Sequence, residues 1–180
     1  MYKGSYMVDK ELLDEIKDDF YSGRILVKPS EVSAAAPIGY LSNKRTSTKL
    51  DVHRTWYPEF CEQVASMHDE LEVTQIDVLH YDKGQKFDKH YDRIIGEEEN
   101  RVYTTVSILE LSDDYEGDGL VLYSSGDDDV GYSPEMKEGQ TIVFPAEHWH
   151  AASPVVQGTR LVVTAWLGRI QKWLISDLYK

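Results

Sequence analysis

The sequence is poor in cysteine, in basic residues and in long apolar runs. Its one cysteine, Cys61, cannot form an internal disulfide or a metal site built from several cysteines, so any metal must be held by histidine and carboxylate. No apolar stretch approaches the ~20 residues that a membrane-spanning helix needs. The first thirty residues also lack the apolar core of a signal peptide. We therefore expect a cytoplasmic protein without a membrane segment.

Basic residues are outnumbered, with 19 lysines and arginines against 32 acidic residues and a net charge of −13. Two acidic runs stand out, at 97–99 and 127–129. Such a surface repels phosphate backbones, so nucleic acid is an unlikely partner. The runs themselves have two interpretations: they are solvated loops, or they attract a basic segment of the substrate.

The length of 180 residues suits a single domain, 1–180, with one hydrophobic core. Apolar residues recur at helical spacing between Asp9, a candidate N-cap, and Gly23, a candidate stop, which predicts a first helix. A second helix is predicted over 57–71, with a proline in its first turn. The segment 25–43 reads as a strand followed by an irregular connection. The tail 170–180 has the spacing of a last helix.

From about residue 73 the pattern changes to short β-branched or aromatic segments bounded by turn residues, which predict strands. Two helices followed by strands with no helices between them argue against a parallel α/β sheet and for an antiparallel sandwich or jelly roll. We expect helical support over about 1–72 and a β-barrel core over about 73–168. The predicted strands are 73–81, 101–111, 119–123, 140–144 and 160–167.

A His-x-Asp pair on an extended segment points two metal ligands to the same side, as iron(II) oxygenases with two histidines and one carboxylate require. Counted as His-x-Asp or His-x-Glu, the pair alone is weak evidence, because six histidines times 32 acidic residues over 180 positions predict about one match by chance. Three matches occur, beginning at His68, His80 and His90. The first falls in the predicted second helix, where i and i+2 diverge. Only the surrounding sequence can choose between the other two.

The context of His90 resembles that of the prolyl 4-hydroxylase group of 2-oxoglutarate oxygenases. In 81–92 (YDKGQKFDKHYD), a tyrosine, a glycine turn and an aromatic residue lead into the His-x-Asp pair, as in that group. The stretch 139–166 is similar to the group's distal half, with Phe-Pro, a histidine, Pro-Val, Gly, Arg and Trp in order. These positions are His150, Pro154, Gly158, Arg160 and Trp166. The stretch 105–123 also resembles the group, but its glycine pair is split into Glu-Gly-Asp-Gly at 116–119.

This resemblance implies a double-stranded β-helix (a cupin-like jelly roll) preceded by two helices, with His90, Asp92 and His150 as catalytic metal ligands. It also implies Fe(II), 2-oxoglutarate and O2 as cofactor and cosubstrates, with ascorbate as reductant. A dicarboxylate that chelates iron needs a fixed cation for its far carboxylate, and a buried arginine at the start of an apolar strand suits that need. Arg160 is that residue, Tyr81 matches a tyrosine that hydrogen-bonds the cosubstrate, and Trp166 is expected to line the pocket.

Several alternatives stay open at this stage. His148 offers a second His-x-His pairing, although the spacing to the later motif selects His150. Thr105 or Ser107 could reach the cosubstrate. A retained aspartate favours hydroxylation with release of succinate and CO2 over halogenation. The rivals are a cupin-like metal-binding module without turnover and a Zn(II)-dependent hydrolase.

The substrate is expected to be a protein, a peptide or a small molecule, and the resemblance favours peptidyl proline. The loops 91–101 and 124–138 flank the predicted mouth and are either substrate lids or plain mobile loops. Oligomeric state cannot be read from the sequence.

Overall fold

The computed structural model describes residues 4–30, 44–92 and 101–169. Their strands form two antiparallel sheets. The larger sheet has seven strands in the order β1-β8-β6-β10-β4-β3-β2. Its strands are β1 (Gly4–Met7), β2 (Val27–Pro29), β3 (Thr48–Leu50), β4 (Leu71–Tyr81), β6 (Arg101–Leu111), β8 (Gln140–Pro145) and β10 (Arg160–Arg169).

The smaller sheet has three strands in the order β5-β9-β7. They are β5 (Phe87–His90), β9 (His150–Ala152) and β7 (Leu120–Leu122). Apolar residues of β7 pack against Ile142 and Phe144 of β8, so the smaller sheet faces the larger one. The mainly β, antiparallel architecture expected from the sequence is confirmed.

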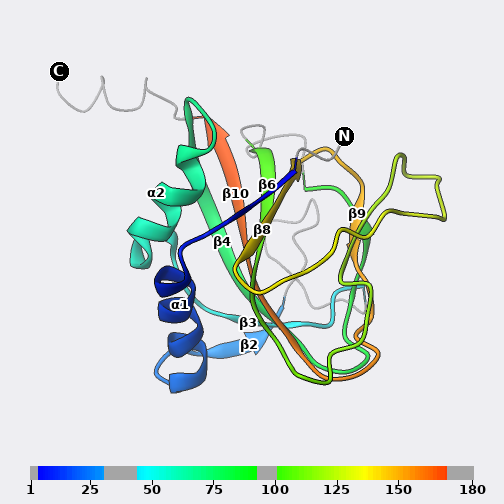
Figure 1. Ribbon diagram of the computed structural model, residues 1–180, viewed down its shortest axis with the longest axis horizontal. Helices are drawn as coiled ribbons and strands as arrows, with labels where there is room; N and C mark the ends of the chain where they lie inside the picture. The colour runs from blue at the N-terminus through cyan, green and yellow to red at the C-terminus, as the bar shows by residue number, and fades with distance from the viewer. Residues whose placement is uncertain (1–3, 31–43, 93–100, 170–180) are drawn as a thin grey trace.

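Two α-helices cover the other face of the larger sheet (Figure 1): α1 (Lys10–Ser22) and α2 (Pro58–Ser66). A short 3-10 helix, η1 (Arg54–Trp56), precedes α2. As predicted, Asp9 caps α1 by accepting a hydrogen bond from the backbone of Glu11, and Gly23 ends it in the left-handed conformation. Ile16 and Phe60 are fully buried between these helices and the sheet, in the main hydrophobic core.

Two expectations for the N-terminal part were wrong in detail. Strands interrupt the helical support expected over about 1–72, because β1 precedes α1 and both β2 and β3 lie between the helices, although β2 falls within the segment 25–43 whose start was expected to be a strand. The second helix is also shorter than 57–71, since it ends at Ser66 and a turn with Glu70 at φ 62° leads into β4. The ladder between β4 and β10 begins at Leu71, paired with Arg169, and this extended pairing excludes a longer helix. His68 therefore lies in a turn.

The predicted strands match β4, β6, β7, β8 and β10 within one or two residues at each end. The predicted final helix at 170–180 lies outside the described residues, as does most of the loop 91–101. Within the described residues, no helix combines the length and apolar character needed to cross a membrane.

Candidate metal and cosubstrate site

A cavity of about 550 Å³ lies between the two sheets. Its wall on the larger sheet follows strand alternation, because every second residue of β10, from Arg160 to Trp166, points into it. The facing residues of β4, from Gln75 to Tyr81, do the same. The smaller sheet closes the cavity with His90 and His150 among others.

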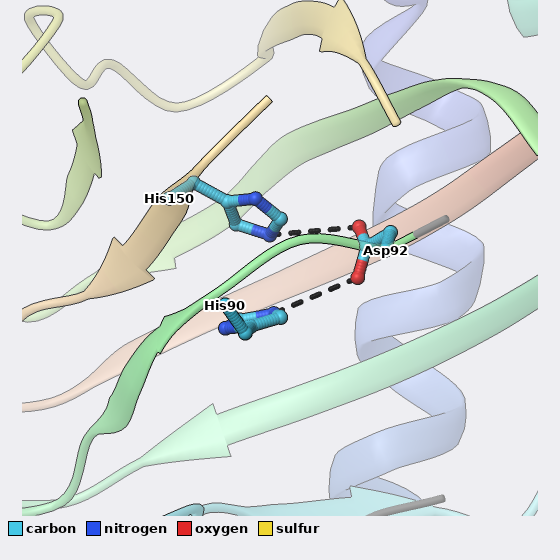
Figure 2. A group of neighbouring side chains, drawn as sticks. All are labelled: His90, Asp92 and His150. Carbon is cyan, nitrogen blue, oxygen red and sulfur yellow. Dashed lines mark ion pairs between the residues drawn. The ribbon is translucent and has the colours of Figure 1, made fainter. Parts of the chain in front are cut away.

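Among the residues that the structure describes, one cluster in the cavity could bind a metal ion. His90 and His150 are direct partners in the antiparallel pairing of β5 and β9, and Asp92 follows β5 by two residues. The Nε2 atoms of both histidines lie 3.5 Å from the two carboxylate oxygens of Asp92, one on each oxygen. Figure 2 shows both rings pointing toward that carboxylate. All three donor atoms lie within 4.8 Å of one another.

The backbone sets the orientation of both imidazole rings. Nδ1 of His90 is 2.7 Å from the carbonyl oxygen of Asp88, and Nδ1 of His150 is 2.9 Å from that of His148. A carbonyl can only accept a hydrogen bond, so each Nδ1 is the donor and each Nε2 is the ring nitrogen directed at the cluster. Packing supports the rings, since Phe87 stacks on His90 with centroids 3.7 Å apart and Phe144 lies 4.7 Å from His150.

Asp92 is 8% exposed, yet it is held as a carboxylate. Burial alone would raise its pKa, but the neighbouring His150 and His90 and a 2.6 Å hydrogen bond from the Thr104 hydroxyl together keep the pKa of Asp92 well below its usual range. Burial lowers the pKa of His150 to about 4, against the attraction of Asp92. At neutral pH the cluster therefore offers an ionised carboxylate and a neutral imidazole, the forms that bind a metal.

Arg160 lies at the other end of the cavity and is 2% exposed. Its Nη1 donates to the hydroxyl of Tyr115 at 3.0 Å, and its guanidinium lies 4.4 Å from the centre of the Tyr81 ring. Its Nη2 is buried without a hydrogen-bond partner, and among the described residues no carboxylate forms an ion pair with it. A buried guanidinium is costly without an anion, so the cavity is built to receive one here.

Trp166, the third expected pocket residue, is 6% exposed and lines the cavity on the same face of β10. The guanidinium of Arg101 lies 4.4 Å from the Trp166 ring and also donates to Gln75 Oε1 at 2.8 Å and to the backbone carbonyl of Asp92 at 3.4 Å. Arg101 thus ties the tryptophan to the segment that carries the cluster's carboxylate.

The other histidines lie outside the cluster. His148 is half-buried and its ring is not part of the cluster, whereas its backbone carbonyl accepts a hydrogen bond from His150. His80 faces the helix side of the sheet and stacks on Phe20 at 5.3 Å. His68 stacks on Tyr103, and His53 caps η1. The selection of His90 over His68 and His80 from the three sequence matches agrees with this arrangement.

Sequence reasoning missed Thr104 and Tyr115. It proposed Thr105 or Ser107 instead, but neither lines the cavity: Thr105 donates to the Ala165 carbonyl, and Ser107 pairs with Thr141. The alternation of β6 makes Thr104 and Val106 the inward residues. The sequence 101–111 shows this alternation, but it does not show which of the two faces points into the cavity.

The chain matches the model of the 2OG-Fe(II) oxygenase superfamily over residues 76–168, a little more than half its length. It is 32% identical over 93 residues to a PKHD-type hydroxylase of Paracoccus denitrificans, covering 48% of this chain and 39% of the relative. The chain spans less than half the length of the curated relatives it matches.

Solved structures of low sequence identity share the fold. A prolyl-4-hydroxylase of Pseudomonas putida is 15% identical with a TM-score of 0.60, covering 93% of this chain and 92% of its own. A prolyl hydroxylase of Trichoplax adhaerens, in complex with a hypoxia inducible factor peptide fragment, is 16% identical with a TM-score of 0.63, covering 96% and 87%. With the family model, the chain belongs to the 2OG-Fe(II) oxygenase superfamily.

Proposed function

We propose that this chain is a hydroxylase that uses Fe(II), 2-oxoglutarate and O2, with His90, Asp92 and His150 as the iron ligands. Two neutral imidazoles and one carboxylate on one side of an ion are the donor set of such enzymes. Bonds of ~2.1 Å at right angles place neighbouring donors ~3 Å apart. The 3.5 Å separations of this cluster are therefore close to what one bound ion requires.

The single observation that carries the proposal is the buried Arg160, whose Nη2 has no partner within the described part of the chain. A cavity that bound only a metal ion would not require a buried arginine. We assign Arg160 to the far carboxylate of 2-oxoglutarate, which a planar guanidinium can pair with two parallel hydrogen bonds. The ring of Tyr81 packs against the Arg160 guanidinium, and the hydroxyl of Tyr115 accepts a hydrogen bond that orients it.

When bound, the iron and 2-oxoglutarate supply the activation of O2, with oxidation of the cosubstrate to succinate and CO2 and hydroxylation of the substrate. The chain's own residues set the geometry. Thr104 holds one oxygen of Asp92, and the backbone fixes the orientation of both histidine rings. Val106, Val162 and Trp166 provide apolar wall to the cavity between the two ends.

For the substrate we propose a prolyl residue in a peptide, with ascorbate sustaining turnover. Two of the solved neighbours are described as prolyl hydroxylases, one of them in complex with a peptide fragment. Their identity to this chain is low, so this part of the proposal is supported by the fold and by the open cavity between the sheets alone.

The decisive measurement is succinate formation from 2-oxoglutarate with Fe(II) and ascorbate, with and without candidate peptides. Calorimetry of the Mn(II)-loaded protein adds the affinity for 2-oxoglutarate. We expect the wild type to form succinate from 2-oxoglutarate even without a substrate. Arg160→Gln should bind 2-oxoglutarate about 100-fold more weakly, since a charge-assisted pair is removed.

Arg24→Gln is the matched control, because Arg24 is exposed and lies just after α1. The Arg24→Gln variant should keep the wild-type affinity for 2-oxoglutarate. Absence of succinate from the metal-loaded wild type would rule out the enzyme and leave a metal-binding module. Activity with Zn(II) on a hydrolysable ester or amide would instead favour the hydrolase alternative.

A further inference from the structure

The outer face of the smaller sheet carries a second concave site, the outer groove, which the proposed function does not use. Its volume is about 580 Å³, within the ~300–1,000 Å³ of common ligand sites. Strand alternation separates the two faces of the sheet, because Leu120 and Leu122 of β7 pack toward the larger sheet and Val121 between them lines the groove. On β9, His150 lines the inner cavity and Ala151 lines the groove. The floor of the outer groove is therefore small and apolar.

One wall of the outer groove is formed by the loop 124–138, which is bonded to the smaller sheet. The backbones of Leu122 and Tyr132 pair through two hydrogen bonds of 2.8 and 2.7 Å. Nζ of Lys89 on β5 donates to the backbone carbonyl of Asp128 at 2.8 Å. These contacts make the loop a fixed wall of the groove and not a detached lid.

The charged groups of the outer groove leave negative charge unmatched. Lys86 and Asp88, at β5, pair with each other, with Nζ 2.6 Å from Oδ1. Asp118 and Asp129 line the groove and are exposed, and among the described residues no basic side chain forms an ion pair with either of them. The outer groove therefore presents two carboxylates to a cationic ligand.

A polar group at the floor also has an unused hydrogen-bonding capacity. Ser153 follows β9 and lines the outer groove, and its Oγ is buried without a hydrogen-bond partner in the described part of the chain. Buried hydroxyls are normally hydrogen-bonded. A peptide backbone along the floor would supply the missing partner, because it carries a donor and an acceptor at nearly every residue.

The outer groove adjoins the cavity that contains the metal cluster. Residues 87–89 of β5 line both sites, as does Ala152 of β9. The two sites are thus separated by about the thickness of one sheet layer, ~10 Å. An extended polypeptide covers ~3.3 Å per residue, so about three or four residues are enough to pass from one site to the other.

We propose that the outer groove binds a basic segment of a polypeptide substrate, about three to six residues away from the residue that is hydroxylated. This inference rests on the proposed function and specifies its substrate. The cationic side chains of the segment pair with Asp118 and Asp129, and its backbone lies on the apolar floor. Of the two interpretations of the acidic run 127–129, this one assigns the run to substrate recognition.

The first test compares acetyl-trilysine amide with acetyl-triglutamine amide, which are similar in length and differ in charge. Binding to the full chain loaded with redox-inert Mn(II) and 2-oxoglutarate is measured by ligand-observed NMR. Physiological ionic strength screens the general attraction to a chain of net charge −13. We expect the wild type to bind the trilysine peptide about tenfold more tightly, since two exposed ion pairs contribute up to about fivefold each.

Two matched charge reversals locate the binding site. Asp129→Lys should reduce the affinity for the trilysine peptide by about tenfold, because it replaces an attraction by a repulsion. Glu62→Lys is the control, because Glu62 is exposed on α2, on the other face of the larger sheet, and the net charge changes equally. This variant should stay within about twofold of the wild type. Both side chains are exposed, so neither substitution disturbs the core.

The second test joins the two sites in one peptide. The probe is acetyl-Gly-Pro-Gly-Ser-Gly-Ser-Lys-Lys-Lys amide, which has four residues between the proline and the lysines, together with its counterpart in the reverse order. One of these peptides should bind at least about tenfold more tightly than the trilysine peptide and than its own glutamine version, because the second contact becomes intramolecular. Asp129→Lys should remove this gain and leave the affinity for 2-oxoglutarate unchanged.

The proposal is wrong if the wild type does not prefer the trilysine peptide, or if Asp129→Lys and Glu62→Lys lose affinity equally. It is also wrong if neither joined peptide binds more tightly than the trilysine peptide. A second equivalent of Mn(II) that is lost in Asp129→Lys would overturn it by assigning the acidic wall to a metal cation. A failure of the proposed function looks different: the wild type then does not bind 2-oxoglutarate, whereas it still binds the trilysine peptide and Asp129→Lys still weakens that binding.

Discussion

His90 and His150 lie directly opposite each other in the pairing of β5 with β9, so one pair of short strands brings together residues sixty positions apart. Their rings lie 4.2 Å apart, centroid to centroid, and tilt by 55°. Because the ladder sets the spacing of the two Nε2 atoms, the site does not depend on a flexible loop for two of its three donors. Asp92 adds the third through its position two residues beyond His90.

Metal should stabilise the protein through this cluster. Mn(II) at 100 times its dissociation constant adds about 2.7 kcal/mol to the free energy of unfolding if the unfolded chain binds none. We expect a matching rise in melting temperature that a chelator reverses. The rise in melting temperature should be lost in His150→Ala and kept in His148→Ala, since the ring of His148 lies outside the metal cluster and the backbone carbonyl that accepts from His150 remains. Loss of the rise in His148→Ala would contradict the assignment.

Thr104 should tune metal affinity without touching the metal. Its hydroxyl donates to Oδ2 of Asp92 at 2.6 Å, and loss of such a supporting hydrogen bond typically weakens metal binding by about 10–100-fold. We expect this for Thr104→Val in a calorimetric titration with Mn(II). Thr105→Val is the matched control, because its hydroxyl bonds the Ala165 carbonyl on the helix-facing side of β6. Equal loss in both variants would point to a general disturbance of β6.

The long strands and the cap residues of α1 were predictable because their signals are local. β4, β6 and β10 are rich in β-branched residues, and Asp9 and Gly23 act through their own backbone neighbours. β5 and β9 were not predicted. They have four and three residues, with the sequences FDKH and HAA, and only pairing with each other makes them strands. The ligand set was reached through motif spacing, not through any expectation of this pairing.

The supporting residues show the same limit. Tyr115 lies in a turn with no periodic pattern, and it reaches Arg160 across 45 positions. Arg45 lies between the predicted connection 25–43 and β3, where no secondary structure was predicted, and it pairs with Asp77 of β4 across 32 positions. Such long-range polar contacts leave no mark on the local sequence, whereas the buried Arg160 could be suspected because a charged residue opens an apolar strand.

Arg160 should contribute to binding of 2-oxoglutarate and not to the free energy of unfolding. A buried guanidinium that has no anionic partner among the described residues contributes little or nothing to folding, so Arg160→Met should change the free energy of unfolding of the ligand-free protein by less than about 1 kcal/mol, or raise it. Its neighbour Leu161 is 1% exposed in the main core, and Leu161→Ala should cost about 2–5 kcal/mol. Urea titration measures both. A loss in Arg160→Met as large as in Leu161→Ala would show that the guanidinium is structural.

Gly158 should be required for the stability of the protein and for the position of Tyr115 at the Arg160 end of the cavity. Its φ is +70°, and an added Cβ would lie 2.2 Å from the Ser112 hydroxyl and 3.0 Å from the Tyr115 backbone. The left-handed conformation alone costs alanine about 1–2 kcal/mol, and overpacking adds about 1–3 kcal/mol. Gly158→Ala should therefore destabilise the protein by about 2–5 kcal/mol.

Gly23 provides the control for Gly158, because it has a similar φ of +67° with nothing within 4 Å of an added Cβ. Gly23→Ala should cost about 1–2 kcal/mol and leave 2-oxoglutarate affinity unchanged. Gly158→Ala should also weaken 2-oxoglutarate binding, because displacing Tyr115 removes the hydroxyl that orients the Arg160 guanidinium. Wild-type affinity in a folded Gly158→Ala variant would mean that Tyr115 does not position Arg160 for the cosubstrate.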